Sequence, residues 1–100
     1  MCVYCYQEAR QTGLSPSKLA VLKELAFHAN EDARAWPSIA TIVRFTGWSR
    51  STVNRCLKFL RDNRLIHRDP NYKKWIRSSC YMIDRHSIRE LIERRELDRA

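Results

Sequence analysis

One predicted helix, over residues 49–62, carries side chains suited to contact a polyanion. Arginine can donate paired hydrogen bonds to guanine, and asparagine can pair in the same way with adenine in the major groove of DNA. Serine hydroxyls and the free backbone N–H groups at a helix start suit phosphate. The outward positions of this helix hold such residues: Ser49, Arg50, Ser51, Asn54, Arg55 and Lys58. The alternative is a solvated charged face with no ligand.

A second group of cations follows in the segment 67–77. Two β-competent stretches, 64–68 and 79–83, flank a Pro/Asn turn, which predicts a basic hairpin directly after the helix. Flexible cations at a hairpin tip fit phosphate or minor-groove contacts. Trp75 either joins these contacts or packs the hairpin onto the core. The residues expected to contact DNA from the hairpin are Arg68, Tyr72, Lys73, Lys74 and Arg77.

The positive charge of the chain is concentrated where these residues lie. The 100 residues carry a net charge of +8. Residues 49–77 hold nine basic and two acidic side chains, for a net +7, whereas residues 1–48 have a net +1 and residues 78–100 balance five against five. A basic excess confined to one segment is an electrostatic footprint for a polyanion. Nucleic acid is therefore the expected partner.

Several function classes find no support in the sequence. There is no apolar run of the roughly 18 residues that a membrane helix needs, and no secretory signal, so we expect a cytoplasmic protein without a membrane partner. Cys2 and Cys5 form a C-x-x-C without a second pair, so reduced thiols are expected rather than a metal site. No arrangement of His with Ser, Cys or paired carboxylates predicts catalysis. We expect no enzyme activity, no cofactor and no small-molecule ligand.

Two further helices are expected ahead of the basic helix. Ser15 and Pro16 are typical of a helix start, and the apolar spacing continues to about Asn30. The polar stretch 30–35 predicts a loop. A short helix then begins within Trp36–Pro37–Ser38 and ends at Thr46, and its expected apolar face consists of Ile39, Ile42, Val43 and Phe45.

The junction at Gly47 and Trp48 gives the expected architecture. Glycine fits a left-handed helix end, and Ser49 directly follows as the N-cap of the basic helix. Two helices joined by so short a turn cross steeply, in a helix-turn-helix arrangement, and the hairpin that follows would be a wing. The expected inner face of the basic helix consists of Val53, Cys56, Leu57 and Leu60.

The two ends of the chain give weaker signals. Residues 3–11 fit either a short helix or a strand. At the other end, Ser87 and Glu90 form a capping box that predicts a C-terminal helix, whose apolar residues are Ile88, Leu91 and Ile92. That stripe would either pair two copies into a homodimer or close the core of its own chain. We therefore expect a winged helix-turn-helix DNA-binding domain over residues 1–84 and a C-terminal helix over residues 85–100.

Four stretches resemble a known family: Leu14–Leu22, His28–Asp32, Ala35–Ala40 and Thr46–Val53. They are similar to a bacterial and phage winged helix-turn-helix family found in phage and plasmid replication proteins and in small regulators. The resemblance covers residues 14 to about 83. It implies a mainly α fold with a small β-hairpin (α+β), and DNA binding by the helix that starts at Ser49.

These observations favour a double-stranded DNA-binding protein, acting as a phage or plasmid transcription regulator or as a replication-origin binder. Two alternatives use the same basic surface. One is a protein-interaction module, such as a phage-encoded inhibitor or adaptor that binds an acidic partner. The other is an RNA binder, in which Tyr72 and Trp75 stack on unpaired bases.

Overall fold

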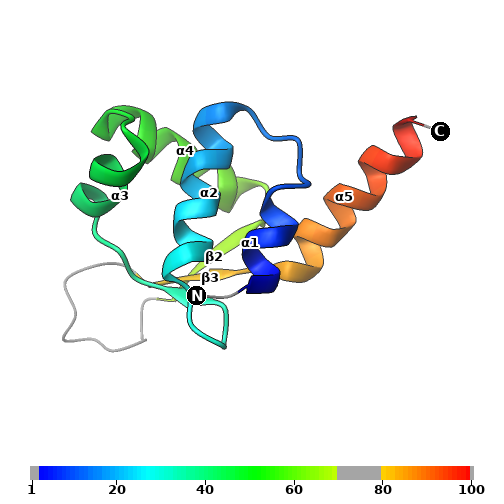
Figure 1. Cartoon of the computed structure of the whole chain (residues 1–100), viewed down its shortest axis with the longest axis horizontal. Coiled ribbons are helices and arrows are strands. Elements are labelled where there is room, and N and C mark those ends of the chain that lie inside the picture. Colours follow the sequence, from blue (N-terminus) through cyan, green and yellow to red (C-terminus); the bar gives the residue numbers. More distant parts are fainter. Residues whose placement is uncertain (1–2, 70–79, 100) are drawn as a thin grey trace.

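A computed structural model of the chain describes residues 3–69 and 80–99, with side chains described for 4–69 and 80–95 (Figure 1). The described elements are α1 (Val3–Ala9), α2 (Pro16–His28), β1 (Arg34–Ala35), α3 (Ile39–Thr46), α4 (Arg50–Asp62), β2 (Ile66–Asp69), β3 (Cys80–Ile83) and α5 (Arg85–Arg99). The fold is mainly helical with one small antiparallel sheet. The predicted α+β class and winged helix-turn-helix architecture are confirmed.

Helix α2 lies at the centre of the helical layer and packs against α1, α3 and α4 (Figure 1). Apolar residues at three- and four-residue spacing put one side of each helix in the same core. On α2 the fully buried side chains are Val21, Leu22, Leu25 and Ala26. The inner face predicted for α4 is confirmed, because Val53, Cys56, Leu57 and Leu60 are all buried.

The sheet has the order β1-β3-β2, with both pairs antiparallel. The antiparallel pairing of the two strands of the predicted hairpin is confirmed, with Ile66 opposite Ile83 and Asp69 opposite Cys80. The first strand of the hairpin starts later than expected, because Arg64 has a φ of 60° and belongs to the turn that ends α4. The first residue of a strand cannot be identified from a short run of β-competent residues alone.

The expectation of a plain loop over residues 30–35 is wrong at its end, where Arg34 and Ala35 form β1. The side-chain oxygen of Asn30 accepts the backbone N–H groups of Asp32 and Arg34, at 2.9 and 3.1 Å, and this folds the turn that delivers β1 to β3. A strand of two residues is too short to show an alternating apolar pattern, so the sequence held no signal for it.

Phe45 does not belong to the buried face of α3. Ile42 is fully buried, and Ile39 and Val43 pack partly against the core, but the Phe45 side chain is 63% exposed. With about 3.6 residues per turn, Val43 and Ile39 lie to one side of Ile42 around the helix axis, and Phe45 lies to the other side. Because all four residues are apolar, the sequence alone did not show that Phe45 lies outside the buried face.

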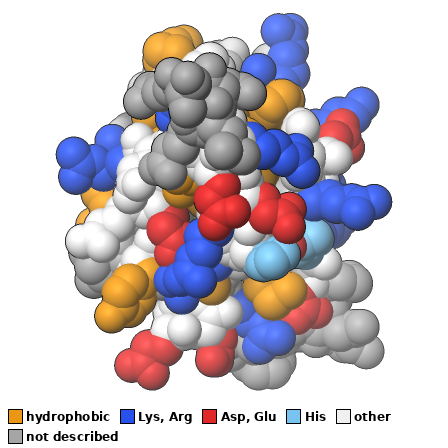
Figure 2. Space-filling model, turned by 90° about the vertical axis from the view of Figure 1, so that its right-hand side faces the viewer, with side chains coloured by type: hydrophobic (Ala, Val, Ile, Leu, Met, Phe, Trp, Pro, Cys, Tyr) orange, Lys and Arg blue, Asp and Glu red, His pale blue; other side chains and the backbone are white. Residues whose placement is uncertain are grey.

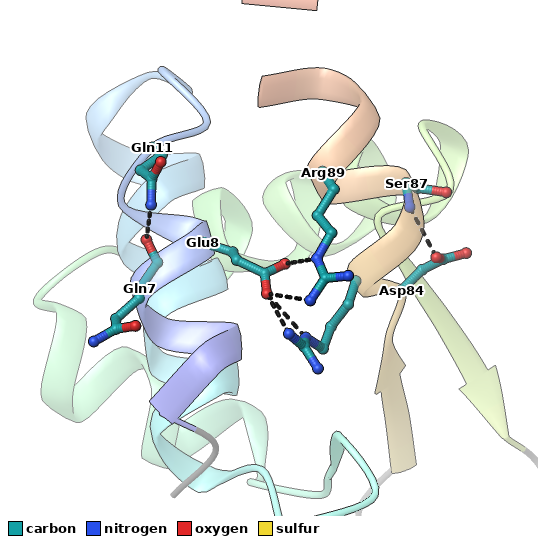
Figure 3. A network of polar contacts seen from close by, with 7 residues as sticks. Gln7, Glu8, Gln11, Asp84, Ser87 and Arg89 are labelled. Atoms are coloured by element: carbon teal, nitrogen blue, oxygen red, sulfur yellow. Dashed lines mark hydrogen bonds and ion pairs between the residues drawn. The ribbon is translucent and has the colours of Figure 1, made fainter. Parts of the chain in front are cut away.

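The start of α5 also differs from the prediction. The helix begins at Arg85, and Asp84 caps it: its Oδ1 accepts the backbone N–H of Ser87 at 3.0 Å (Figure 3). The predicted capping box from Ser87 to Glu90 is therefore wrong. Asp and Ser are equally good N-caps, and the end of β3 at Ile83 sets which of them occupies the position.

Asp84 is also bound from the sheet, since His67 Nε2 on β2 lies 2.7 Å from its Oδ2. Partial burial acts to raise the pKa of Asp84. The hydrogen bonds from His67 and from the backbone and hydroxyl of Ser87 outweigh that effect, so the pKa is lowered below its ordinary value of 3.8. The charged carboxylate thus joins β2 to the start of α5.

Helix α5 continues the fold instead of standing apart from it. Ile88 is fully buried in the core, and Leu91 and Ile92 are partly buried against it. The segment 3–9, for which helix and strand were both open, is the helix α1, and it packs on α5. Glu8 of α1 binds Arg89 of α5 (Figure 3). Beyond this contact α5 runs away from the body of the molecule (Figure 1).

Candidate nucleic-acid interface

The turn between α3 and α4 is made by Gly47, Trp48 and Ser49. Gly47 has a φ of 77° and donates its N–H to the Val43 carbonyl at 2.9 Å, which ends α3. A Cβ at this position would meet nothing within 4 Å, so the left-handed backbone alone favours glycine. The Thr46 hydroxyl donates to the Ile42 carbonyl at 2.6 Å and accepts the N–H of Trp48 at 3.3 Å. The turn is thereby fixed on both sides.

Ser49 is the N-cap of α4, as predicted. Its hydroxyl oxygen accepts the backbone N–H of Thr52 at 3.2 Å and donates to the Thr52 hydroxyl at 3.0 Å. The Ser49 hydroxyl is therefore already engaged within the helix start. The first N–H groups of a helix have no intrahelical acceptor. Those of Arg50 and Ser51 are thus the better donors to a phosphate at this end of α4.

The outer face of α4 brings together the residues that the sequence singled out. With about 3.6 residues per turn, Ser51, Arg55 and Lys58 lie along the middle of the exposed side, with Arg50 and Asn54 along one flank. Every one of the six predicted residues of this helix is exposed. Within the described structure none of the three cations forms an ion pair shorter than 4.0 Å. Their charges are available to a ligand.

Asp62 marks the end of this basic face. It lies on the same side of α4 as Arg55, one turn beyond Lys58, and is exposed. Within the described residues, Arg55 and Asp62 do not form an ion pair. Asp62 therefore ends the middle of the basic face, whereas Arg61, on the flank with Arg50 and Asn54, carries positive charge into the last turn.

The wing is described only at its base. Arg68 lies on β2 opposite Tyr81 and is exposed. The neighbouring Asp69 carboxylate lies 3.8 Å from the Arg34 guanidinium of β1. The remaining predicted wing residues, Tyr72, Lys73, Lys74 and Arg77, and also Trp75, lie outside the described residues.

Trp48 also lies beside this surface, although it is not one of the contact residues predicted from the sequence. It lies directly before the N-cap of α4, and its side chain is 38% exposed. An indole carries one N–H donor on a large apolar ring, which suits a sugar-phosphate edge. The signal in the sequence was its place in the turn, directly before the N-cap of the basic helix.

The opposite end of the molecule is not basic. Figure 2 shows the face toward which α5 runs, where acidic and basic side chains are interspersed with histidine and apolar ones. Residues 78–100 carry as many acidic as basic side chains. The excess positive charge thus belongs to the side of α4 and β2.

Metal-binding groups do not gather in the described part of the chain, where no cluster of three His, Cys, Asp or Glu side chains occurs. Cys5 is fully buried in the core, Cys56 is buried as expected, and Cys80 is buried as well, all three as thiols. Cys2 lies outside the described residues. None of the described helices is both long and apolar enough to cross a membrane.

The tight turn, the helix after it and the antiparallel hairpin define a winged helix-turn-helix protein. In a comparison with protein families, the model of a helix-turn-helix domain matches residues 12–66, more than half of the chain. The chain therefore belongs to this family. The matched residues run from before α2 to the first residue of β2. Searches of curated proteins and of solved structures gave no match. Helix-turn-helix domains are typically DNA-binding modules without catalytic chemistry.

Proposed function

We propose that this protein binds double-stranded DNA, with α4 in the major groove and the segment 67–77 on the backbone. One observation carries the proposal: six polar and basic residues are exposed on one helix directly after the helix-turn-helix turn, and its cations have no ion-pair partner within the described structure. A helix that places unpaired cations outward at this position is the element that enters the groove in such domains.

The residues of α4 divide into two roles under this proposal. Arg55 and Asn54 lie midway along the helix, where side chains reach base edges, and they would provide sequence preference. Arg50 and Ser51 lie in the first turn, where backbone N–H groups and a cation suit phosphate. Lys58, one turn further along α4, and Arg68, on β2, add two more cations. The wing residues Tyr72, Lys73, Lys74 and Arg77 would follow the backbone.

The biological role that fits this activity is that of a phage or plasmid transcription regulator or replication-origin binder. The support is the resemblance of the stretches 35–40 and 46–53 to proteins with those roles. Either role is performed on DNA in the cytoplasm and needs neither a catalytic group nor a cofactor. Selection of binding sites from random duplexes, followed by footprinting, would identify the target and separate the two roles.

A salt titration tests the DNA proposal. Each neutralised phosphate releases counterions and contributes a log–log slope of about −0.9 for duplex DNA, so about five contacts per protomer predict a slope of about −4 to −5. Duplex DNA, single-stranded DNA and RNA of equal length are titrated side by side. A steep slope and a preference for the duplex support the proposal. A slope near zero contradicts it, and a preference for RNA favours the RNA-binding alternative.

One surface favours protein binding as a second candidate function. Phe27 and Phe45 are 55% and 63% exposed, and they line a hollow of about 310 Å³ together with Tyr6. The His28 ring lies near both phenylalanines, with its centroid 5.5 Å from that of Phe27 and 6.4 Å from that of Phe45. Exposed apolar patches with a polar rim mark interaction sites. Substituting both phenylalanines by serine should leave duplex DNA binding unchanged if this surface serves a protein partner.

A further inference from the structure

A groove lies at the C-terminal end of α4, between that helix and α5. It has a volume of about 500 Å³. Its apolar side is made by Leu14, Phe59 and Leu91, which pack against the core but remain partly exposed. The helix α5 forms one wall along its first turns and then leaves the body of the molecule (Figure 1). An apolar groove beside a projecting helix leaves surface that another molecule can cover.

The charges around this groove set it apart from the rest of the molecule. Glu90 and Arg94 lie on its α5 wall, one turn apart, and Asp62 and Arg64 lie across from them. Figure 2 shows how acidic and basic side chains mix on this end of the molecule. The chain as a whole has a net charge of +8, yet residues 78–100 are balanced. Two copies of this chain repel each other on a basic face but not here.

We propose that a second copy of this chain covers the groove, with the two α5 helices antiparallel about a two-fold axis that crosses them between Glu90 and Arg94. The same surface then serves both copies, as a two-fold interface requires. In this arrangement Glu90 of each copy faces Arg94 of the other, and both Leu91 side chains lie near the axis above the apolar floor. Burial of the leucine and phenylalanine surface supplies the affinity, and the two ion pairs set the antiparallel direction.

The pairing surface and the DNA surface do not overlap. Asp62 lines the groove, whereas the residues of α4 proposed to contact DNA lie between Ser49 and Lys58 and none of them lines it. A pair formed in this way leaves both α4 faces open, and such a pair would bind two half-sites. The pairing itself does not depend on DNA binding, so it is measured without DNA, and its failure would leave the proposed function standing.

Sedimentation equilibrium of the full-length chain, over the concentrations at which it binds DNA, tests the pairing. Glu90→Arg and Arg94→Glu each place like charges opposite one another at both symmetry-related contacts, and each should weaken the dimer about tenfold. The double variant Glu90→Arg with Arg94→Glu restores opposite charges and should recover the affinity of the wild type. Glu90 also lies 2.9 Å from His86, but that pair is largely exposed and its loss should not affect the fold.

Two matched controls change the net charge equally on other surfaces. Glu31→Arg, in the exposed turn before β1, matches Glu90→Arg, and Arg44→Glu, exposed on α3, matches Arg94→Glu. Both should leave the dimer unchanged, and a thermal melt of every variant shows that it folds. A monomer at all concentrations would overturn the proposal. So would a dimer that ignores both single reversals, or one that the double variant fails to restore.

Discussion

Arg85 directs two donors at one carboxylate oxygen of Glu8, its Nη2 at 2.6 Å and its Nε at 3.0 Å, across 77 residues of sequence. The other oxygen of Glu8 lies 3.4 Å from Arg89 Nε, one turn further along α5. The Glu8 side chain is only 13% exposed. These contacts hold the first helix of the chain against the last one, and they tie α5 to the domain that carries α4.

Removing the Glu8 carboxylate should therefore destabilise the protein. Glu8→Ala removes a carboxylate that two guanidinium groups share, and charged hydrogen bonds of this kind contribute about 1.5–3 kcal/mol. For a domain of this size the melting temperature should fall by about 4–8 °C per kcal/mol, measured by circular dichroism. Glu31→Ala, in an exposed turn, is the matched control and should melt like the wild type. Equal melting of both variants would show that the cluster adds no stability.

Acid should weaken the fold through Asp84. Its pKa is lowered in the folded state, so the stabilisation is present above the unfolded-state value and is lost as the pH falls through the folded-state pKa, below the ordinary value of 3.8. Asp84→Asn keeps a good N-cap but has no charge to lose. The free energy of unfolding should therefore differ between wild type and Asp84→Asn at neutral pH, and the difference should shrink as the pH falls below 3.8.

Denaturant unfolding at a series of pH values measures this difference. Asp32→Asn removes the same charge from an exposed turn and serves as the control for the loss of one negative charge. A gap between wild type and Asp84→Asn that stays constant down to the lowest pH would contradict the role of the carboxylate.

The two glycines of the described chain should respond differently to alanine. Both have positive φ, 71° at Gly13 and 77° at Gly47, which costs a residue with a Cβ about 1–2 kcal/mol. At Gly47 nothing else opposes the Cβ, whereas at Gly13 it would run into the Arg95 guanidinium of α5. Gly13→Ala should therefore cost more than Gly47→Ala.

A double-mutant cycle isolates the contribution of Arg95. The extra cost of Gly13→Ala should disappear in an Arg95→Ala background, measured by denaturant unfolding. If the cost is the same in both backgrounds, Arg95 moves aside freely and the close approach has no energetic weight.

Arg55→Ala should lower the preference of the protein for its own site. Arg55 is exposed and makes no described ion pair, so its removal should not affect folding. The loss should be about 1–3 kcal/mol on the preferred duplex and much less on random DNA. Competition titrations with both duplexes give the specificity ratio, and a melting scan checks the fold. Arg10→Ala, an exposed cation after α1, is the control and should leave that ratio unchanged.

The wing lysines should act in another way. Replacing Lys73 and Lys74 together by alanine should weaken binding to both duplexes by a similar factor, and should lower the salt slope by up to about 2. The reason is that flexible cations at a hairpin tip suit phosphates rather than base edges. If the lysine pair changes the specificity ratio while Arg55→Ala does not, then the wing and not α4 provides the sequence preference.

The sequence by itself determined the parts of this protein that depend on local chemistry. Ser49, Gly47 and the apolar spacing of α4 are signals carried within one turn of the chain, because caps, left-handed glycines and helical faces involve near neighbours. The outward face of α4 followed from the same spacing, and all six of its predicted residues are exposed.

Only the tertiary structure decided the features that involve partners far apart in the chain. Two good caps, Asp84 and Ser87, compete within four residues, and the choice depended on the end of β3 and on His67. The strand β1 exists because β3 offers it an edge, and Phe45 is exposed because the helices around α3 cover a different side of it. The contact of Glu8 with Arg85 likewise has no local signature, since either charge alone is typical of a solvated surface. Such choices are set by packing between distant segments, which a local pattern does not encode.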